Sequence, residues 1–426
     1  MAPSGASGGA SAGASGSTSR LTVRPTARGW QALAFGVLTL VVARLIGTTQ
    51  FHQLAYLLLA LPLASLVLGI VGSRGLAYSR SLPPGTRITA GKEARLRLLL
   101  ERSRFGAAKV SVVDRLPERR EFDFPGWRKD KKFEVPISFA RRGVYRLGPA
   151  EIRLVDPFGL LAFARRFEER TEVVVYPSVY RLGSFPLLGG NVDAGTRGAR
   201  GRRGEEFSNL REYRRGDDRR HIHWKSLART GELFVKEFSV QAPRRHTVAL
   251  DLRREGLRVQ EQEVEDAVSV AASLITYLKR EGLPFRLLAK EAEAGFGSDE
   301  DFYWREMRSL AMARADGVRP LGETLIERRG ALGEAVVIVS RTRDEELPRA
   351  VRKLREAGLS VIVVALATHT YRTPAMPGSA SGAAREREAE FLGRVGRLET
   401  AGATVRTISH PDGIEGLFGA RMVGAL

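Results

Sequence analysis

Two long apolar stretches near the N-terminus constrain this chain more than any other feature. Residues 54–72 contain no charged side chain, and residues 30–46 contain only Arg44, near the end of the stretch. A helix needs roughly 17–25 apolar residues to cross the bilayer core, so both stretches can span it. Trp30 suits the aromatic belt at the membrane–water interface. The sequence therefore predicts a transmembrane hairpin over residues 20–74.

Positive charges around the hairpin predict its orientation. Arginines precede the first stretch and follow the second, whereas the connector, residues 47–53, contains neither Lys nor Arg. By the positive-inside rule, both flanks lie in the cytoplasm and the connector lies outside. We therefore expect a two-pass protein of the plasma (inner) membrane with both termini in the cytoplasm. A cleaved secretory signal fits less well, because no small-x-small cleavage site follows the first stretch.

Composition narrows the chemistry that the rest of the chain can perform. The 426 residues include no cysteine, which excludes disulfides, thiolate catalysis and cysteine-ligated metal sites. The formal net charge of +20 favours an anionic neighbour. With the predicted hairpin, that neighbour is the lipid bilayer, and no specific nucleic acid is expected. Residues 1–19, rich in Ala, Gly and Ser, are predicted to be a disordered tail.

Residues 75–182 are predicted to form a β-rich, immunoglobulin-like segment without chemistry of its own. Alternating or β-branched residues, separated by Pro- and Gly-containing turns, predict several short strands. These strands are expected at residues 94–100, 109–113, 132–139 and 172–176. Short strands over about a hundred residues are typical of a β-sandwich.

Residues 246–426 are predicted to form a doubly wound α/β domain. Strands rich in Val, Ile and Leu alternate with amphipathic helices, which predicts a parallel sheet covered on both faces. Strands are expected at residues 246–252, 284–289, 334–340, 359–366 and 404–408. Helices are expected at residues 261–280, 302–315, 344–357 and 385–400.

Function in such a sheet is expected at the carboxyl ends of the strands, and the first strand ends in Asp251. A von Willebrand factor A-type domain holds a metal there with an Asp-x-Ser-x-Ser motif, but this chain has Arg253 and Glu255 at those spacings. The fixed positive charge of an arginine repels a divalent cation. Arg341 follows a later strand where a second Asp is wanted. Asp251 and Thr324 remain the candidate ligands, and we predict neither a metal nor a cofactor.

The densest segment of reactive side chains is residues 205–238, for which three interpretations compete. The first is a metal-dependent hydrolase that uses Asp217, His221 and His223 as base and ligands. The second is a surface for anionic lipid or nucleic acid, in which the Arg-rich seam of residues 183–203 contacts phosphates.

The third interpretation, which we favour, is a structural network. Arg211, Arg220 and Arg229 are expected to pair with Asp217 and nearby glutamates, while Trp224 packs between the β-rich and α/β units. Residues 183–245 thus combine a seam with a signature motif. The signature residues, structural or partner-binding, are Arg211, Tyr213, Gly216, Asp217, Arg220, Trp224, Ala228 and Arg229.

This signature resembles that of the bacterial "domain of unknown function 58" family. Residues 142–148, 156–160 and 175–177 also match the part of that family that precedes the signature. The resemblance implies a two-helix anchor, a β-rich segment and a von Willebrand A-like domain. It also implies association with a MoxR-type AAA+ ATPase, often beside a transglutaminase-like membrane protein. Our leading hypothesis is therefore a non-enzymatic adaptor or scaffold at the cytoplasmic face of the bacterial inner membrane.

Overall fold

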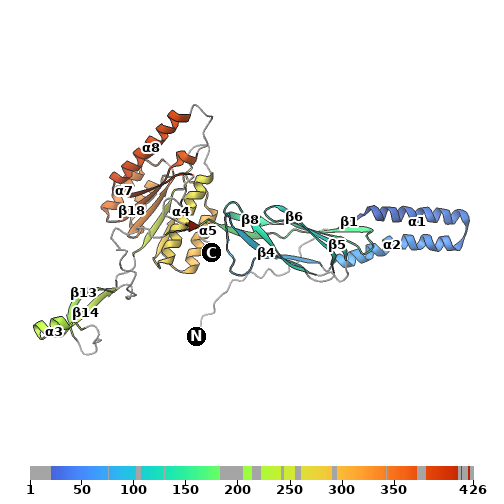
Figure 1. Ribbon diagram of the computed structural model, residues 1–426, viewed down its shortest axis with the longest axis horizontal. Helices are drawn as coiled ribbons and strands as arrows, with labels where there is room; N and C mark the ends of the chain where they lie inside the picture. The colour runs from blue at the N-terminus through green and yellow to red at the C-terminus, as the bar shows by residue number, and fades with distance from the viewer. Residues whose placement is uncertain are drawn as a thin grey trace. The chain divides into compact units, whose positions relative to one another are not determined.

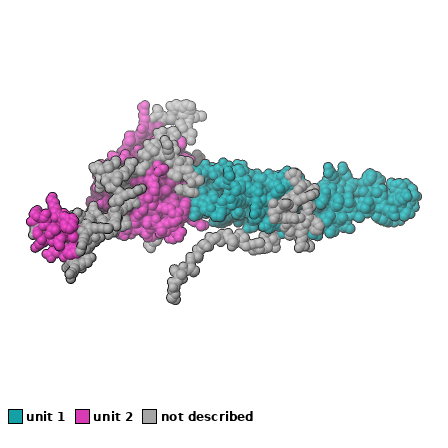
Figure 2. Space-filling model, turned by 60° about the horizontal axis from the view of Figure 1, so that its bottom comes forward, with its two compact units in different colours: residues 1–176, 425–426 teal, residues 177–424 magenta. Residues whose placement is uncertain are grey.

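The computed structural model divides into two compact units, unit 1 (residues 1–176 and 425–426) and unit 2 (residues 177–424) (Figure 2). It describes residues 21–74, 76–101, 107–127, 131–182, 205–213, 222–240, 244–254, 261–289, 295–341, 343–371, 380–410, 414 and 421–422. The predicted tail and the Arg-rich seam lie outside the described residues.

Unit 1 contains two long apolar helices that form a hairpin (Figure 1). Helix α1 (Ala27–Ile46) ends at Gly47, which adopts the left-handed conformation, and α2 (Thr49–Arg74) follows at once. Both are long and apolar enough to cross a membrane, with mean hydropathies of 1.7 and 2.5. They pack closely because Gly36 has no Cβ, which would lie 3.0 Å from a methyl of Leu59. The predicted hairpin is confirmed at the level of two long apolar helices.

The rest of unit 1 consists of three mainly antiparallel sheets, ordered β1-β10-β9-β5-β6, β3-β11-β8 and β2-β4-β7 (Figure 1). The strands are β1 (Leu21–Pro25), β2 (Ala77–Ser81), β3 (Ile88–Thr89), β4 (Glu93–Glu101), β5 (Ala107–Arg115), β6 (Arg119–Trp127), β7 (Lys131–Ser138), β8 (Gly143–Leu147), β9 (Ala150–Val155), β10 (Leu161–Phe167) and β11 (Thr171–Tyr176). Their inward side chains share one core, against which Leu66 and Ile70 of α2 also pack. All four strands predicted here are confirmed.

The main element of unit 2 is a five-stranded parallel sheet, ordered β16-β15-β17-β18-β19. Its strands are β15 (His246–Leu250), β16 (Phe285–Leu288), β17 (Ala335–Ser340), β18 (Ser360–Leu366) and β19 (Thr404–Ile408). Counted along the chain this order is 2-1-3-4-5, a common doubly wound arrangement. The five predicted strands are confirmed, although the first ends at Leu250 rather than at residue 252.

Helices cover both faces of this sheet. They are α4 (Glu261–Arg280), α5 (Glu300–Met312), α6 (Leu321–Glu327), α7 (Leu347–Glu356) and α8 (Ala380–Thr400). Apolar residues of α6, α7 and α8 form one core cluster with β17 and β18. Helix α4 contacts β15, β16 and β17 without joining that cluster, so it lies on the opposite face, and α5 packs on α4.

Two small sheets complete unit 2. Strands β13 (Glu205–Glu212) and β14 (Phe234–Val240) pair antiparallel and, with α3 (Trp224–Thr230) between them, form what we term the signature hairpin. Strand β12 (Tyr180–Arg181) pairs with β20 (Arg421–Met422) near the C-terminus. The signature hairpin shortly precedes β15 in the sequence, so the signature and the first strand of the parallel sheet are close along the chain.

Candidate functional site

The carboxyl ends of β15 and β17 meet at the switch point of the sheet, where doubly wound proteins bind ligands. We call the residues that follow these two strands, Asp251, Arg341 and Asp344, the sheet edge. Asp251 comes directly after the fully buried β15, and its backbone N–H donates to the carbonyl of Val339 at 2.9 Å. Its Oδ1 accepts the backbone N–H of Arg253 at 3.0 Å, which fixes the carboxylate in a tight turn.

A buried guanidinium occupies the sheet edge. The side chain of Arg341 is 2% exposed, and its Nη1 donates to Oε1 of Glu263, in the first turn of α4, at 2.7 Å. Its Nη2 donates to the carbonyl oxygen of Arg253. A fixed positive charge is therefore held inside the protein, one strand away from Asp251, by an ion pair with α4.

Asp344 supplies the second acidic group of the sheet edge. Its Oδ2 accepts the backbone N–H of Gly322 at 2.7 Å, and its Oδ1 accepts that of Glu346 at 3.1 Å. Gly322 has no Cβ, which would lie 2.7 Å from the backbone of Glu346, so glycine permits this approach. Burial raises the pKa of Asp344 above its usual range, and the charge of Asp251 acts in the same direction. The Asp344 carboxyl thus fixes the backbone at Gly322 and Glu346, next to the sheet edge.

Sequence reasoning missed Asp344 and misplaced the start of α7. The helix was predicted from residue 344, but it begins at Leu347 because Asp344 binds the turn that precedes it. An Asp shortly after a buried strand is a signal that could have identified the residue. The N–H of Gly322, from a different segment, could not have been foreseen, because it reaches Asp344 only through packing of α6 against α7.

The sheet edge does not fit a divalent cation. Such a cation needs several oxygen ligands, whereas the buried Arg341 presents a positive charge there. The hydroxyl of Thr324, the other candidate ligand, donates to the carbonyl of Pro320 at 3.3 Å within its own helix. Glu255 lies outside the described residues. Among the described residues, no group of three or more His, Asp or Glu side chains could hold a metal.

The structure describes only some of the predicted signature residues. Gly216, Asp217 and Arg220 lie outside the described residues, as do His221 and the side chain of Arg211, so the predicted ion pairs stay a prediction. The hydrolase interpretation is likewise untested.

Within the described part of the hairpin, Tyr213 follows β13, and its N–H donates to the carbonyl of Leu233 at 2.8 Å. Nδ1 of His223 lies 2.7 Å from the hydroxyl oxygen of Ser226. Ala228 and Arg229 are both exposed on α3.

The packing of Trp224 between the β-rich and α/β units stays a prediction. Within the hairpin, Trp224 is the first residue of α3, and its side chain is 62% exposed. The interior of the hairpin is filled instead by Ile222 and Val235, which form a β-bridge and are both buried. Trp224 therefore presents a large apolar ring to its surroundings, beside the exposed Lys225.

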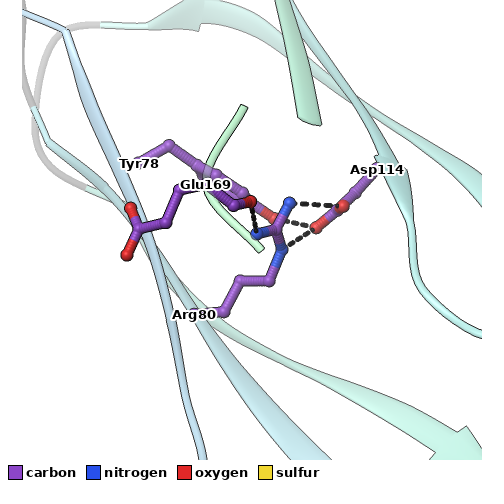
Figure 3. Close-up of polar contacts among 4 residues, drawn as sticks. All are labelled: Tyr78, Arg80, Asp114 and Glu169. Carbon is purple, nitrogen blue, oxygen red and sulfur yellow. Dashed lines mark hydrogen bonds and ion pairs between the residues drawn. The ribbon is translucent and has the colours of Figure 1, made fainter. Parts of the chain in front are cut away.

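Unit 1 contains a separate buried polar cluster that joins two of its sheets (Figure 3). Nε and Nη2 of Arg80, on β2, donate to the two carboxylate oxygens of Asp114, on β5, at 2.7 Å each. The Tyr78 hydroxyl donates to the same carboxylate at 2.5 Å, and burial raises the pKa of Tyr78. Nη1 of Arg80 donates to the carbonyl of Glu169 at 3.1 Å. This cluster therefore has a structural role, since it joins β2 to β5.

Asp114 also lines a surface cavity of about 180 Å³. Arg115, Arg119, Arg166 and Glu151 are among its lining residues. Arg166 pairs with Glu168 at 2.7 Å and Glu151 with Arg153 at 2.7 Å, so neighbouring charges already engage two of these side chains.

Comparisons with known proteins match the region around the signature to a protein family. Residues 209–294 match the family model described as "Protein of unknown function DUF58", so the predicted family resemblance is confirmed. The chain is 24% identical to the uncharacterized protein YeaD of Bacillus subtilis (strain 168) over 329 residues, which cover 71% of this chain and 81% of YeaD. The matched region runs from β13 past β16 and thus includes α3, Trp224 and Asp251.

The apo structure of Bacteroides uniformis beta-glucuronidase 3 aligns with 78% of this chain, at 9% identity and a TM-score of 0.15. The alignment spans about a third of that enzyme, 32% of its chain. A likeness this low carries no argument about fold or function.

Proposed function

We propose that this chain, which carries a DUF58 domain, is a two-pass protein of the bacterial inner membrane that acts as a non-enzymatic adaptor. Helices α1 and α2 would anchor it, with both termini in the cytoplasm. Its partner would be a MoxR-type AAA+ ATPase, as the family resemblance implies, with a transglutaminase-like membrane protein as a further component. Unit 2 would be von Willebrand A-like, and unit 1 would supply an immunoglobulin-like spacer.

The observation that carries this proposal is the exposure of Trp224 within the DUF58 match. Tryptophan and arginine are enriched among the residues that dominate protein–protein binding energy. Here the exposed Trp224 begins a short helix that also exposes Lys225 and Arg229. A ring of this size on a surface, with two positive charges on the same helix, suits an acidic protein surface with an apolar pocket.

The chemistry of the sheet edge supports binding rather than catalysis. A general acid or base must reach a substrate atom, but both oxygens of Asp344 accept backbone N–H groups. The guanidinium of Arg341 is likewise held by Glu263 and by a backbone carbonyl. These groups stabilise the loops that follow the strands, and those loops can then present a fixed surface to a protein partner.

A crosslinking pull-down tests the proposal. The full chain, tagged at its C-terminus, is crosslinked in native membranes with and without ATP, and its partners are identified by mass spectrometry. We expect an AAA+ ATPase with the wild type, and strong depletion of it with Trp224→Ala. Val318→Ala is the control, because Val318 is an apolar residue of unit 2 that is 87% exposed outside the hairpin.

Two outcomes would overturn the proposal. Repeated failure to recover an ATPase under both nucleotide conditions would remove the partner. Equal recovery with Trp224→Ala and with Val318→Ala would remove the signature hairpin as the binding surface. Recovery of lipid or nucleic acid alone would instead favour the Arg-rich seam.

A further inference from the structure

The turn between β9 (Ala150–Val155) and β10 (Leu161–Phe167) is residues 156–160, a segment that the adaptor proposal does not use. Asp156 is buried, and its two carboxylate oxygens accept the backbone N–H groups of Phe158 at 2.9 Å and Leu161 at 2.6 Å. The N–H of Gly159 donates to the Asp156 carbonyl at 3.0 Å. The carboxylate thus holds the turn in one conformation.

This turn holds the beginning of α1. The hydroxyl of Thr26 donates to the carbonyl of Gly159 at 2.7 Å, and the N–H of Thr26 donates to the carbonyl of Leu160 at 2.9 Å. The same hydroxyl accepts the N–H of Gly29 at 3.1 Å and caps the helix. A Cβ on Gly29 would lie 2.1 Å from the Leu160 oxygen, so only glycine permits this contact.

The end of α2 is fixed to the same sheet. A Cβ on Gly69 would lie 2.0 Å from the ring of Phe163, on β10. Nη1 of Arg165, also on β10, donates to the carbonyl of Ser73, in the last turn of α2, at 2.7 Å. Both helices therefore leave the sheet at fixed points without a spacer, and the turn lies at the end of the sheet from which they leave (Figure 1).

We propose that Phe158 inserts into the boundary between headgroups and acyl chains and makes a third contact with the bilayer beside α1 and α2. Phe158 is 46% exposed, although its turn is otherwise tightly held. The next residue, Gly159, accepts the hydroxyl of Thr26, which caps the helix whose exposed Trp30 suits the interfacial belt. Arg28 is exposed, and its Nη1 lies 3.7 Å from the Cβ position of Gly159, so an anionic headgroup can be neutralised there.

This inference rests on the proposed membrane anchor. It adds that unit 1 has one orientation on the bilayer, because a rigid turn and two helices define a plane of contact. The role of the 156–160 segment would then be to couple the sheet to the membrane surface.

Single-cysteine labelling tests the inference, because the chain has no cysteine of its own. Phe158→Cys is labelled with an environment-sensitive fluorophore, and the full chain is reconstituted into vesicles of phosphatidylcholine and phosphatidylglycerol. Leu33→Cys, on an exposed position of α1, reports the anchor, and Val144→Cys, on an exposed position of β8, reports a matched apolar site remote from α1. Pro157→Cys is a second site in the turn should Phe158→Cys misfold.

Nitroxide-labelled lipids and aqueous iodide serve as the two quenchers. We expect the label at position 158 to be quenched by the lipids, most strongly by a nitroxide roughly 5–10 Å deep, and to be shielded from iodide. Lipid quenching at position 33 with iodide quenching at position 158 and in Pro157→Cys would overturn the inference and leave the anchor intact. Iodide quenching at both positions 33 and 158 would overturn the anchor and the inference together.

Discussion

Breaking the buried ion pair at the sheet edge should destabilise unit 2 far more than breaking an exposed pair nearby. In Arg341→Met, the carboxylate of Glu263 loses a donor at 2.7 Å and stays buried. Removing one partner of a buried pair costs about 3–5 kcal/mol, because the other charge is left uncompensated. For a unit of this size, 1 kcal/mol shifts the unfolding temperature by about 2–4 °C, so we expect a fall of roughly 6–20 °C.

The matched control is Arg343→Met, only two positions along the chain. Arg343 also makes an ion pair at 2.7 Å, with Glu390, but the two side chains are 61% and 46% exposed. An exposed pair of this kind contributes about 0–1 kcal/mol, so the control should lower the unfolding temperature by less than about 4 °C. The two variants differ in the burial of the pair and not in its length.

The assay is thermal unfolding of the full chain in detergent, with amide hydrogen exchange of β15 and β17 as the local readout of unit 2. The double variant Arg341→Met/Glu263→Met removes both charges and should recover at least about 2 kcal/mol of the single variant's loss. If Arg341→Met costs no more than Arg343→Met, or if the double variant shows no coupling, the sheet edge is not held by this pair.

Five further variants probe three other features of the molecule. Asp114→Asn should lower the stability of unit 1 by about 3–5 kcal/mol, because it leaves the buried guanidinium of Arg80 without its ion-pair partner. Tyr78→Phe should lower it by only about 1–3 kcal/mol. Thermal unfolding measures both, and equal costs would contradict the dominance of the ion pair. Because burial raises the pKa of Asp344 above 3.8, its stabilising contribution is full below that pH and is lost as the pH rises through the folded-state value. Relative to wild type, Asp344→Asn should therefore be less destabilised at pH 7 than at pH 4, and a pH-independent difference would refute this. Gly69→Ala should cost about 1–3 kcal/mol through overpacking against an aromatic ring, whereas Gly396→Ala, whose Cβ meets nothing within 4 Å, should gain about 0.5–1 kcal/mol; thermal unfolding of both variants gives the comparison.

The sequence by itself determined the elements whose residue pattern follows from a fixed length or a fixed spacing of apolar residues. The hairpin was predictable because the bilayer core sets how many apolar residues a helix requires. The parallel strands were predictable because burial on both faces requires continuous Val, Ile and Leu, as in β17 and β18. Helix α4 was predicted with its observed bounds, Glu261–Arg280, because apolar residues recur along it at helical spacing and glycine follows it.

Only the tertiary structure decided which polar groups meet. Arg341 and Glu263 are 78 positions apart, and the pair forms because β17 and α4 pack together. Ile222 and Val235 come from two separate parts of the signature hairpin, and they fill its interior because the chain pairs them in a β-bridge. Local patterns report whether a side chain prefers water, whereas the partner of a buried charge depends on how distant segments are placed. For this chain, sequence determined the scaffold, and packing decided that a guanidinium and a turn-binding carboxyl lie at the sheet edge.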